Sequence, residues 1–325
     1  MNIQHYQQQV QTAIEAAAAQ LPTHPEGLYE PLRYTLALGG KRMRPLLALM
    51  GAGLYADDVS PAIPAAMGVE LFHNFTLLHD DIMDNAPLRR GKPTVHEKWN
   101  TSIAILSGDV MYTEAFRSIA QCPPAVLSEV LQLFIRTAAE VCEGQQYDMD
   151  FEQQQDVTID AYLRMIELKT AVLLAASLSM GASCAGASKQ DAALLYEFGR
   201  LTGIAFQLQD DILDVYGDPA VFGKQPGGDI LANKKTYLLL SALNRANPMQ
   251  REELLNWLQV PASAGAEKVE GVTALYNQLG IRELARVAMH QHYNQAIDAL
   301  NKLNADPIRK AVLREFTDAL MERET

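Results

Sequence analysis

The sequence predicts an all-α protein, and three observations support this prediction. Ala, Leu, Gln and Met are abundant and aromatic residues make up only 7% of the chain, which favours helix over strand. Apolar residues recur at helical spacing over long segments, and no strand-like alternation of useful length occurs. No linker rich in Gly, Ser or Pro divides the chain. We therefore expect residues 1–325 to form a single large helical domain.

Proline and glycine mark the ends of the expected helices. The first helix covers residues 2–20 and is broken by Pro22 and Pro25, and the second covers residues 27–38 and ends at two glycines. A central helix is expected at residues 62–84, because its apolar faces are broad enough for burial on nearly all sides. Further helices are expected at residues 102–121, 125–150, 158–180, in a segment that ends at Tyr216, and at residues 235–243, 251–258, 272–303 and 307–322.

The charge of the chain limits its partners. The formal net charge is −12 at pH 7. Nucleic acids and anionic membrane surfaces would repel such a chain, so we expect neither as a partner. The basic residues must therefore be gathered at particular places.

Cysteine usage and the N-terminal segment indicate a cytoplasmic protein. Cys122, Cys142 and Cys184 are too few and too widely spaced for a disulfide framework or a zinc site, so we expect three core thiols. The N-terminal segment has neither the basic start nor the apolar stretch of a signal peptide. No run approaches the roughly 18 apolar residues that a membrane span needs. We expect a soluble protein that does not insert into membranes.

The central helix ends in an acidic pattern. Asp80 and Asp84 lie four residues apart, so their carboxylates face the same side of the helix. Carboxylates at this spacing suit Mg²⁺, which prefers oxygen ligands and is usually shared with substrate phosphates. Arg89 and Arg90 follow five residues later, and guanidinium groups bind phosphate oxygens through paired hydrogen bonds. Metal and basic residues together indicate a diphosphate ligand.

The same acidic pattern occurs a second time, at residues 210–214. Phe206 and an apolar turn precede it, and its three aspartates have the same spacing as those at residues 80–84. A single copy is often only a solvated helix end. Two copies at the ends of apolar helices predict a facing pair of metal sites.

Two features in the N-terminal part of the chain also point to phosphate binding. Two glycines at residues 39–40 precede Lys41, Arg42 and Arg44, so backbone N–H groups and cations converge there. His73 lies seven residues before Asp80, about 20° away around the helix, and is therefore expected on the carboxylate face.

Lys169 and Thr170 interrupt a run of apolar turns. Such a lysine either extends to the surface or neutralises a buried phosphate. A segment rich in glycine and lysine at residues 222–236 is the third basic element beside an aspartate pattern.

These elements, in this order, resemble the trans-isoprenyl diphosphate synthases, also called polyprenyl synthetases. The matching residues are Gly40 to Pro45, Asp80 to Asp84, Arg89 and Arg90, Lys169 and Thr170, Gln207, Asp210 to Asp214, Lys224 and Lys234. The resemblance covers nearly the whole chain. It implies an isoprenoid synthase type I-like fold, a helical bundle around a deep central cavity with the two aspartate patterns facing each other, and a homodimer. One departure is Asn233, where many members have glycine.

The resemblance implies a role for each group of residues. The diphosphate of isopentenyl diphosphate would be held by Lys41, Arg44, His73 and Arg90. The allylic diphosphate would be held by Arg89, Lys169, Thr170, Gln207, Lys224 and Lys234. The metal ligands would be Asp80, Asp84 and Asp210, supported by Asp81, Asp148, Asp214 and Asp229. The catalytic residues would be Asp80, Asp84, Lys169, Asp210 and Lys224.

The implied reaction is a head-to-tail (1'-4) condensation of isopentenyl diphosphate with dimethylallyl, geranyl or farnesyl diphosphate. Breaking the allylic C–O bond leaves a diphosphate that the aspartates would repel unless cations compensate, so about three Mg²⁺ ions per site are expected. The allylic cation is then attacked by the double bond of isopentenyl diphosphate. No side chain in these patterns is an obvious general base, which makes the released diphosphate the expected proton acceptor.

Product length depends on residues just before the first aspartate. In the family the positions of Phe75 and Thr76 lie on the floor of the cavity, where a bulky side chain stops elongation. One aromatic residue with threonine resembles the pattern of C20 synthases, and Phe72 adds a second large ring that disfavours C25 or longer products. We expect C20 geranylgeranyl diphosphate, with C15 farnesyl diphosphate as the alternative.

Two other protein classes remain as alternatives. A terpene cyclase also uses an aspartate pattern and Mg²⁺, but it binds one diphosphate and does not need the second basic group of Lys41, Arg44 and Arg90. A non-catalytic subunit of a prenyl synthase would be expected to have lost an aspartate pattern or a lysine, and this chain keeps them. Release of pyrophosphate only in the presence of both substrates would distinguish the three.

Overall fold

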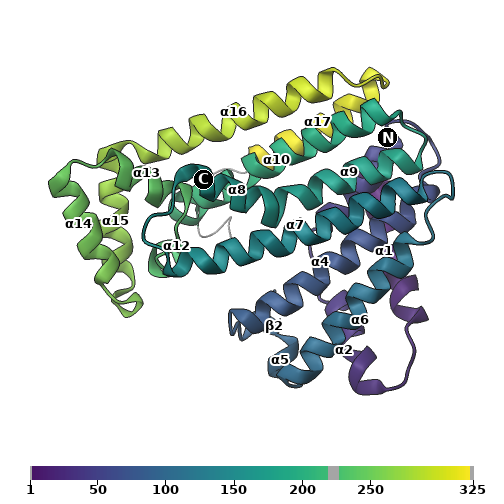
Figure 1. Cartoon of the computed structure of the whole chain (residues 1–325), viewed down its shortest axis with the longest axis horizontal. Coiled ribbons are helices and arrows are strands. Elements are labelled where there is room, and N and C mark those ends of the chain that lie inside the picture. The colour runs from purple at the N-terminus through teal and green to yellow at the C-terminus, as the bar shows by residue number, and fades with distance from the viewer. Residues whose placement is uncertain (1, 219–226, 323–325) are drawn as a thin grey trace. The chain divides into compact units, whose positions relative to one another are not determined.

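The computed structural model of the chain describes residues 2–218 and 227–322. Helices make up almost all of the regular structure in these residues, which confirms the all-α prediction (Figure 1). The N-terminal elements are α1 (Ile3–Gln20), α2 (Glu26–Ala37), α3 (Met43–Gly53), the 3₁₀ turn η1 (Ser60–Ala62), α4 (Ile63–Met83), β1 (Leu88–Arg89), β2 (Lys92–Pro93), α5 (Val95–Lys98) and α6 (Thr101–Ile119).

Most of the remaining helices lie close to their expected positions. The middle elements are α7 (Leu127–Gln153), α8 (Ile159–Ile166), the π-helical turn η2 (Glu167–Ala171), α9 (Val172–Cys184) and α10 (Lys189–Tyr216). The C-terminal elements are α12 (Gly228–Leu231), α13 (Tyr237–Arg245), α14 (Pro248–Gln259), the 3₁₀ turn η3 (Ala262–Ala264), α15 (Ala266–Leu279), α16 (Ile281–Asn301) and α17 (Pro307–Met321).

The chain divides into two compact units. Unit 1 comprises Met1–Ala138, Leu173–Tyr196 and Leu303–Leu313, and unit 2 comprises Ala139–Val172, Glu197–Lys302 and Arg314–Thr325. Buried apolar side chains occur in both, among them Leu46 and Phe72 in unit 1 and Leu238 and Leu275 in unit 2. The expectation of a single domain over residues 1–325 stays a prediction.

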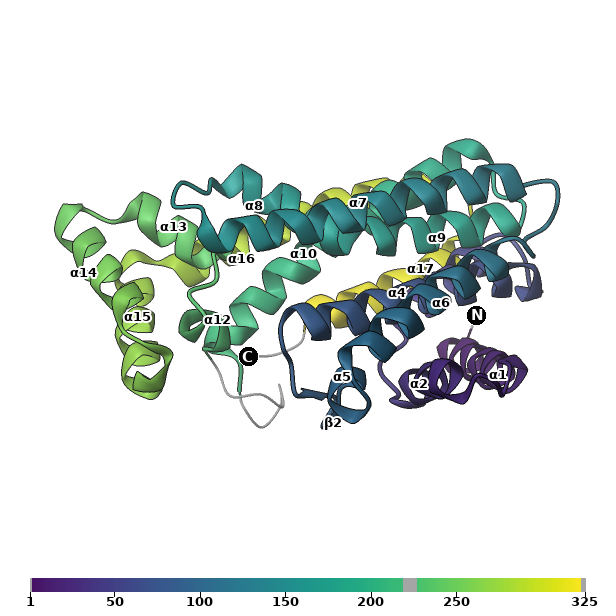
Figure 2. The same ribbon diagram turned by 60° about the horizontal axis from the view of Figure 1, so that its bottom comes forward.

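Helix α4 is the central helix of unit 1, as expected. It packs along α6, and the two helices lie side by side in Figures 1 and 2. Two glycines permit this close approach: a Cβ at Gly68 would lie 2.5 Å from a side-chain carbon of Ile119, and one at Gly108 would lie 2.3 Å from Nε2 of His79. The packing fixes the direction in which the carboxylates at the end of α4 point.

The basic segment after α4 is a small β-hairpin. Leu88 pairs with Pro93 and Arg89 with Lys92. The two turn residues between them, Arg90 and Gly91, have φ values of 54° and 74°, the left-handed conformation that a two-residue hairpin turn requires. Arg89 therefore lies on a strand of the hairpin and Arg90 in its turn, so the two neighbouring side chains point in different directions.

One expected helix, at residues 272–303, is wrong as a single element. The chain forms α15 and α16 instead, and Gly280 between them has a φ of 68°. Glycine in the left-handed conformation commonly ends a helix, so Gly280 was the residue that could have predicted this break from the sequence.

The stretch Ile159–Cys184 comes closer to a membrane span than we expected from the sequence. It is 26 residues long, and its most apolar window has a mean hydropathy of 1.4. However, 83% of that window is buried within the protein, as in the core helix of a folded chain.

A second correction concerns the cysteines: Cys122 and Cys184 are buried, but Cys142 is exposed and is not a core thiol.

Candidate active site

The first aspartate pattern lies at the C-terminal end of α4, in unit 1. The backbone N–H of Asp84 donates to the carbonyl of Asp80 at 2.8 Å, so the last helical turn carries both residues on one side. Asp80 is half-buried and Asp84 is exposed. Asp81 is buried and accepts two hydrogen bonds from Arg89 on one oxygen, at 2.8 Å from Nε and 2.5 Å from Nη2. Asp81 and Arg89 therefore hold the hairpin against the end of α4.

A buried carboxylate that the sequence analysis missed orients the glycine loop before α3. Glu70 on α4 is 2% exposed and forms a close ion pair with Arg42. Asn74, one turn later, donates to the same Oε1 of Glu70 at 2.8 Å. Nη2 of Arg42 donates to the carbonyl of Leu36 at 2.5 Å. Glu70 is an isolated acidic residue in an apolar part of the helix, and this pattern could have predicted its role, because a buried charge requires a partner.

His73 lies among arginines, as its place on the carboxylate side of α4 indicated. Its Nε2 is 3.0 Å from Nη1 of Arg44, and since arginine can only donate, Nε2 accepts and Nδ1 carries the proton of the neutral ring. Burial, and then the charges of the surrounding arginines, hold the pKa of His73 well below its usual range. Those arginines are Arg44, Arg90, Arg89 and Arg42.

Arg44 keeps its charge in this environment. Burial lowers its pKa to about 10, against the opposing effect of Glu70, so the guanidinium remains protonated at neutral pH. Arg42 is bound by Glu70 and Arg89 by Asp81. This group of positive charges attracts an anion with more than one negative charge.

Arg90 lies over the glycine loop. Its Nη1 forms a close hydrogen bond to the carbonyl of Gly39. The φ of Gly40 is 124°, which favours glycine, and a Cβ there would lie 2.5 Å from the Cζ of Arg90 and displace the guanidinium. Lys41 follows in the same loop and is exposed. Unit 1 thus brings together Lys41, Arg44, His73 and Arg90, the residues implied to hold isopentenyl diphosphate.

In unit 2, Lys169 and Thr170 lie in the π-helical turn η2. Such turns widen a helix locally and occur often at functional sites. A Cβ at Gly144 on α7 would lie 2.2 Å from the backbone N of Lys169 and 2.6 Å from its Cα. Gly144 therefore permits α7 to contact the turn directly, and that contact fixes the position of the Lys169 backbone.

Lys169 is paired with Asp148, one turn after Gly144 on α7. The Nζ–Oδ2 distance is 2.5 Å, and both side chains are about 30% exposed or less. The resemblance implied Asp148 as a support of the metal ligands, and that role stays a prediction. The ion pair makes Asp148 a direct partner of Lys169.

Asp211 is the centre of a buried polar network. The hydroxyl of Tyr162 donates to Oδ2 in a close hydrogen bond, and the backbone N–H of Tyr237 reaches the same oxygen at 3.3 Å. Gln207 Nε2 lies 3.4 Å from Oδ1, and Thr170 donates to Gln207 at 3.4 Å. Burial raises the pKa of Asp211 to about 7, although these hydrogen bonds oppose the shift. Tyr162 and Asp211 were missed by the sequence analysis as supports of Gln207.

Asp214 and Asp229 shape the turn that carries Lys234. Asp214 Oδ2 accepts from the backbone N–H of Asp229 at 2.9 Å, which caps the start of α12. Nζ of Lys234 lies 3.6 Å from Oδ1 of Asp229. Burial opposes the charge of Lys234, but Asp229, Asp148 and Asp211 together raise its pKa. Asp210, the implied metal ligand, is half-buried at the end of α10.

A pocket of about 150 Å³ in unit 2 gathers most of these groups. It is lined by Lys169, Thr170, Gln207, Lys234, Asp148, Asp211 and Asp229, together with Tyr162 and its neighbours. These residues belong to α7, α8, η2, α10, α12 and the segment after α12. Lys224, expected beside them, lies outside the described residues.

The residues expected to limit product length belong to an aromatic cluster in unit 1. Phe75 stacks on Tyr112 of α6, with ring centroids 5.0 Å apart and planes 21° from parallel. Phe72 contacts Phe75, Tyr112 and Phe134 at centroid distances of 5.6 to 5.7 Å. Thr76 donates instead to the carbonyl of His73 at 2.9 Å. Tyr112 was not anticipated, because only the tertiary contact between α4 and α6 brings it to Phe75.

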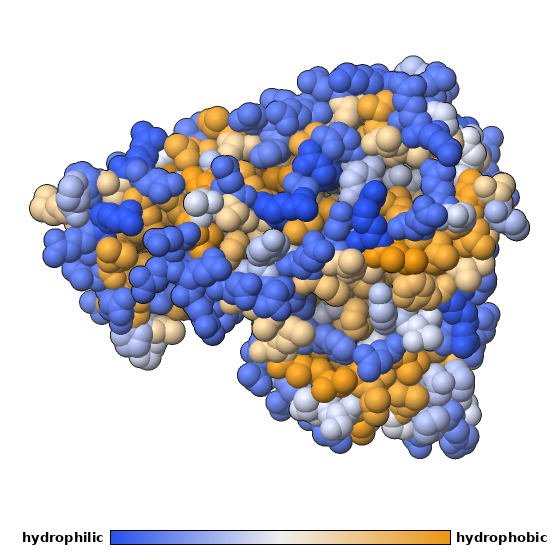
Figure 3. Space-filling model, in the orientation of Figure 1, coloured by the Kyte–Doolittle hydropathy of each residue, from blue (hydrophilic) through white to orange (hydrophobic). Residues whose placement is uncertain are grey.

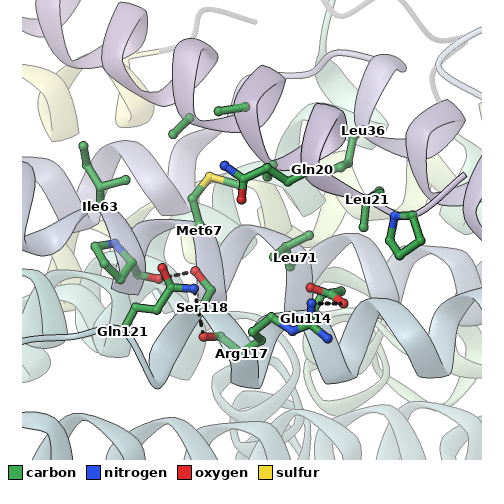
Figure 4. Close-up of a pocket in the computed structure, with 15 residues that line it drawn as sticks. Gln20, Leu21, Leu36, Ile63, Met67, Leu71, Glu114, Arg117, Ser118 and Gln121 are labelled. Carbon is green, nitrogen blue, oxygen red and sulfur yellow. Dashed lines mark hydrogen bonds and ion pairs between the residues drawn. The ribbon is translucent and has the colours of Figure 1, made fainter.

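A larger cavity in unit 1 lies on another face of α4. Its volume is about 280 Å³, and Figure 4 shows Met67 and Leu71 of α4 pointing into it beside Gln20 of α1 and Arg117 of α6. Arg117 pairs with Glu114 at 3.4 Å. None of the residues predicted for the site lines this cavity. We therefore do not assign it to the active site.

The carboxylates fit a hard cation that is shared with a ligand. Within the described part of the chain, no three His, Cys, Asp or Glu side chains lie close enough to hold a metal by themselves. Mg²⁺ usually binds through one or two carboxylates, substrate phosphates and water. Asp80 and Asp84 on one helical turn, and Asp210 in unit 2, have the right donor chemistry for that type of site.

Comparison with known proteins gives a consistent result. A family model described as Polyprenyl synthetase matches residues 25–279. A short chain isoprenyl diphosphate synthase from Methanothermobacter thermautotrophicus is 38% identical over 302 residues, which are 92% of this chain and 91% of that protein. A geranylfarnesyl diphosphate synthase from Natronomonas pharaonis is 37% identical over 328 residues, with 95% and 94% of the two chains covered.

Solved structures show the same similarity. The crystal structure of a geranylgeranyl pyrophosphate synthase matches with a TM-score of 0.94 and 42% identity over 100% of both chains. A polyprenyl synthase from Caulobacter crescentus, complexed with calcium and isoprenyl diphosphate, matches with a TM-score of 0.83 and 27% identity over 98% of this chain and 95% of that one.

Proposed function

The chain belongs to the polyprenyl synthetase family and is a trans-prenyltransferase, and from this premise we propose that it makes geranylgeranyl diphosphate. The reaction is the head-to-tail (1'-4) condensation of isopentenyl diphosphate with dimethylallyl, geranyl and farnesyl diphosphates in turn. The aromatic cluster of Phe72, Phe75 and Tyr112 is the observation that carries the choice of a C20 product.

The allylic diphosphate is proposed to bind in unit 2. Lys169, Thr170 and Gln207 line one pocket with Lys234, and their donors would hold the diphosphate as the allylic C–O bond breaks and its electron pair leaves with the oxygen. Asp148 and Asp229 keep the two lysines in place. Arg89 is the unit 1 member of this set, and Asp81 orients it.

Isopentenyl diphosphate is proposed to bind in unit 1. Lys41, Arg44 and Arg90 would hold its diphosphate, with the Nδ1–H of neutral His73 as a further donor. Its double bond then attacks the allylic cation, and a proton is lost from the adduct to the released diphosphate. No chain residue is required as the base in this scheme.

We also propose Asp80, Asp84 and Asp210 as the ligands of about three Mg²⁺ ions per site. The chemistry that these ions would supply is neutralisation of charge on the departing diphosphate. Asp81, Asp214 and Asp229 would support the metal ligands without binding the metal themselves, since each already binds protein N–H groups or a cationic side chain.

Product length is the finer part of the proposal. The similar proteins include a geranylgeranyl and a geranylfarnesyl synthase, so similarity alone leaves C20 and C25 products open. The stacked rings of Phe75 and Tyr112 leave less room for the growing prenyl chain than one ring would, which favours the C20 product over the C25 product. The alternative is a C15 product, and the position of Tyr112 against Phe75 is the observation in its favour.

Product analysis tests this proposal. The purified protein is given dimethylallyl and isopentenyl diphosphates, and pyrophosphate should be released only when both are present. Dephosphorylated products are then separated by chromatography for wild type, Phe75→Ala and Phe72→Ala. Both variants should shift the products toward longer chains.

Leu71→Ala is the matched control, because Leu71 lies on the same helix but lines the separate cavity of Figure 4. It should not lengthen the products. Unchanged lengths in both phenylalanine variants would mean that these rings are not the floor. A C15 product from wild type would select the alternative.

A homodimer in the cytoplasm completes the proposal. Ile105 and Leu106 of α6 are 43% and 58% exposed, and Ile135 of α7 is 50% exposed. Hydrophobic residues gather over α5 and α6 in Figure 3. A second copy covering this face of unit 1 would remove the apolar surface from water. Sedimentation of wild type and of Leu106→Glu would test the interface.

A further inference from the structure

Lys268, near the start of α15, is completely buried. Its exposed fraction is 0%, which is rare for lysine. Its Nζ donates to Oδ1 of Asn233 and to the carbonyl of Val260, both at 2.8 Å, and both acceptors are uncharged. Burying an ammonium group is costly, and a methionine would fill similar space without that cost. Packing therefore does not explain a lysine here, whereas its hydrogen bonds do.

Asn233 is held by these contacts in an unusual backbone conformation. Its φ is 54°, in the left-handed region that glycine adopts without penalty and that asparagine tolerates better than most residues. Its Nδ2 donates to the carbonyl of Leu258 at 2.9 Å, while its Oδ1 accepts from Lys268. The side chain thus links the turn after α12 to the end of α14 and the start of α15, elements that contact one another within unit 2 (Figure 1).

The turn at Asn233 sets the position of Lys234. The backbone N–H of Asn233 donates to Ile230 at 3.1 Å and that of Lys234 donates to Asp229 at 2.9 Å. Lys234 then reaches Asp229 with its side chain and lines the pocket that contains Lys169. A change of φ at residue 233 would turn Lys234 away from these partners.

We propose that Lys268 is a positioning residue for Lys234: through Asn233 it holds the left-handed turn that directs Lys234 toward the allylic diphosphate. Asparagine at position 233 needs this clamp, because its left-handed conformation costs free energy that glycine would not. The departure from glycine and the buried lysine are thus two parts of one device. The inference rests on the proposed binding of the allylic diphosphate by Lys234.

The test is a double-mutant cycle measured by steady-state kinetics. Lys268→Met should lower kcat about tenfold, equivalent to about 1.4 kcal/mol in the barrier, with little change in KM for isopentenyl diphosphate. In the Asn233→Gly background the same Lys268→Met change should have less than about a threefold effect, since glycine keeps the turn unaided. Equal effects in both backgrounds would overturn the proposal.

Asn233→Ala provides a matched comparison with Asn233→Gly. Both remove the amide, but only glycine adopts a φ of 54° freely, so alanine should lower kcat and glycine should preserve it. Equal losses would mean that the amide acts in some way other than through the turn, and would contradict the inference.

Two controls separate the remaining explanations. Leu254→Ala removes a fully buried side chain from α14, and at an equal loss of thermal stability it should leave kcat nearly unchanged. An equal fall in kcat would reduce Lys268 to a structural role. Lys234→Ala tests the premise that Lys234 binds the allylic diphosphate. No effect of this variant on kcat would refute the proposed role of Lys234 and with it the inference. A large effect of Lys234→Ala, combined with additive effects of the Lys268 and Asn233 variants, would refute the inference alone.

Discussion

The residues proposed to bind the two substrates differ in charge between unit 1 and unit 2. In unit 1, four arginines surround a neutral His73, and the two buried carboxylates nearby, Glu70 and Asp81, are each bound to one of them. In unit 2, three carboxylates and three lysines line the pocket; they are Asp148, Asp211 and Asp229, and Lys169, Lys234 and Lys235. Asp148 is paired with Lys169 and Asp229 with Lys234. The arginine group of unit 1 can thus attract a diphosphate by itself, whereas the pocket of unit 2 has no excess of lysines over carboxylates and would need additional cations to do so.

This difference suggests a division of labour between the two substrates. A diphosphate that remains attached throughout, as in isopentenyl diphosphate, needs only a fixed group of cations. A diphosphate that leaves develops charge during the reaction, and mobile divalent cations together with lysines can stabilise that change. The variants below test this comparison, beginning with the largest expected effect.

Removing one of the carboxylates proposed to bind metal should have the largest effect. Asp80→Ala, Asp84→Ala or Asp210→Ala should each lower kcat by about 10²- to 10³-fold, as loss of one preorganised electrostatic group does. Titration with Mg²⁺ would measure the apparent metal affinity of each variant. Full activity of wild type in EDTA would contradict the prediction.

Crowding the π-helical turn should have the next largest effect. Gly144→Ala would place a Cβ 2.2 Å from the backbone N of Lys169, so the turn must shift. A displacement of this kind can cost about 10²-fold in kcat. Gly27→Ala is the matched control, because a Cβ there meets nothing within 4 Å. Equal kinetics for the two variants would show that the contact with α7 does not position Lys169.

The cations of the two units should act on different kinetic parameters. Lys41→Ala or Arg44→Ala should raise KM for isopentenyl diphosphate about tenfold, because each removes a contact made before and during the reaction. Lys169→Ala should chiefly lower kcat, since ionisation of the allylic substrate depends on it. Similar changes in both KM values for all three variants would remove the proposed division.

The smallest effects, on the pH dependence of stability, should have opposite signs in the two units. The folded pKa of His73 lies below 6.5, so the unfolded chain binds the extra proton and stability falls as pH drops below about 6.5, by up to about 1.4 kcal/mol per pH unit. The folded pKa of Asp211 is about 7, above 3.8 when unfolded, so its contribution falls as pH rises from about 4 to 7.

Chemical unfolding in EDTA at pH 5 to 8 would measure both contributions. His73→Gln should remove the loss of stability at low pH, and Asp211→Asn should remove the loss on the neutral side. If either variant kept the pH slope of wild type, the corresponding group would not titrate as described.

Local patterns along the chain were sufficient to predict the helical class and to identify the residues of both aspartate patterns. Asp80 and Asp84 could be placed on one side of a helix because helical spacing is a local property, and the recurrence at residues 210–214 needed no knowledge of the fold. The glycine loop at residues 39–40 was also visible. These features depend on neighbours within one or two turns, which the order of residues records directly.

The partners that hold those residues could be identified only from contacts between segments that are distant in the chain. Glu70 meets Arg42, Asp148 meets Lys169 and Tyr112 stacks on Phe75 through contacts between separate helices. The π-helical turn packs directly against Gly144, which is 25 residues away from Lys169 along the chain by their numbers. Asn233 looked like a departure from a family pattern until its φ and its bond to Lys268 gave it a physical reason. Long-range packing selects such pairs, and no local periodicity encodes them.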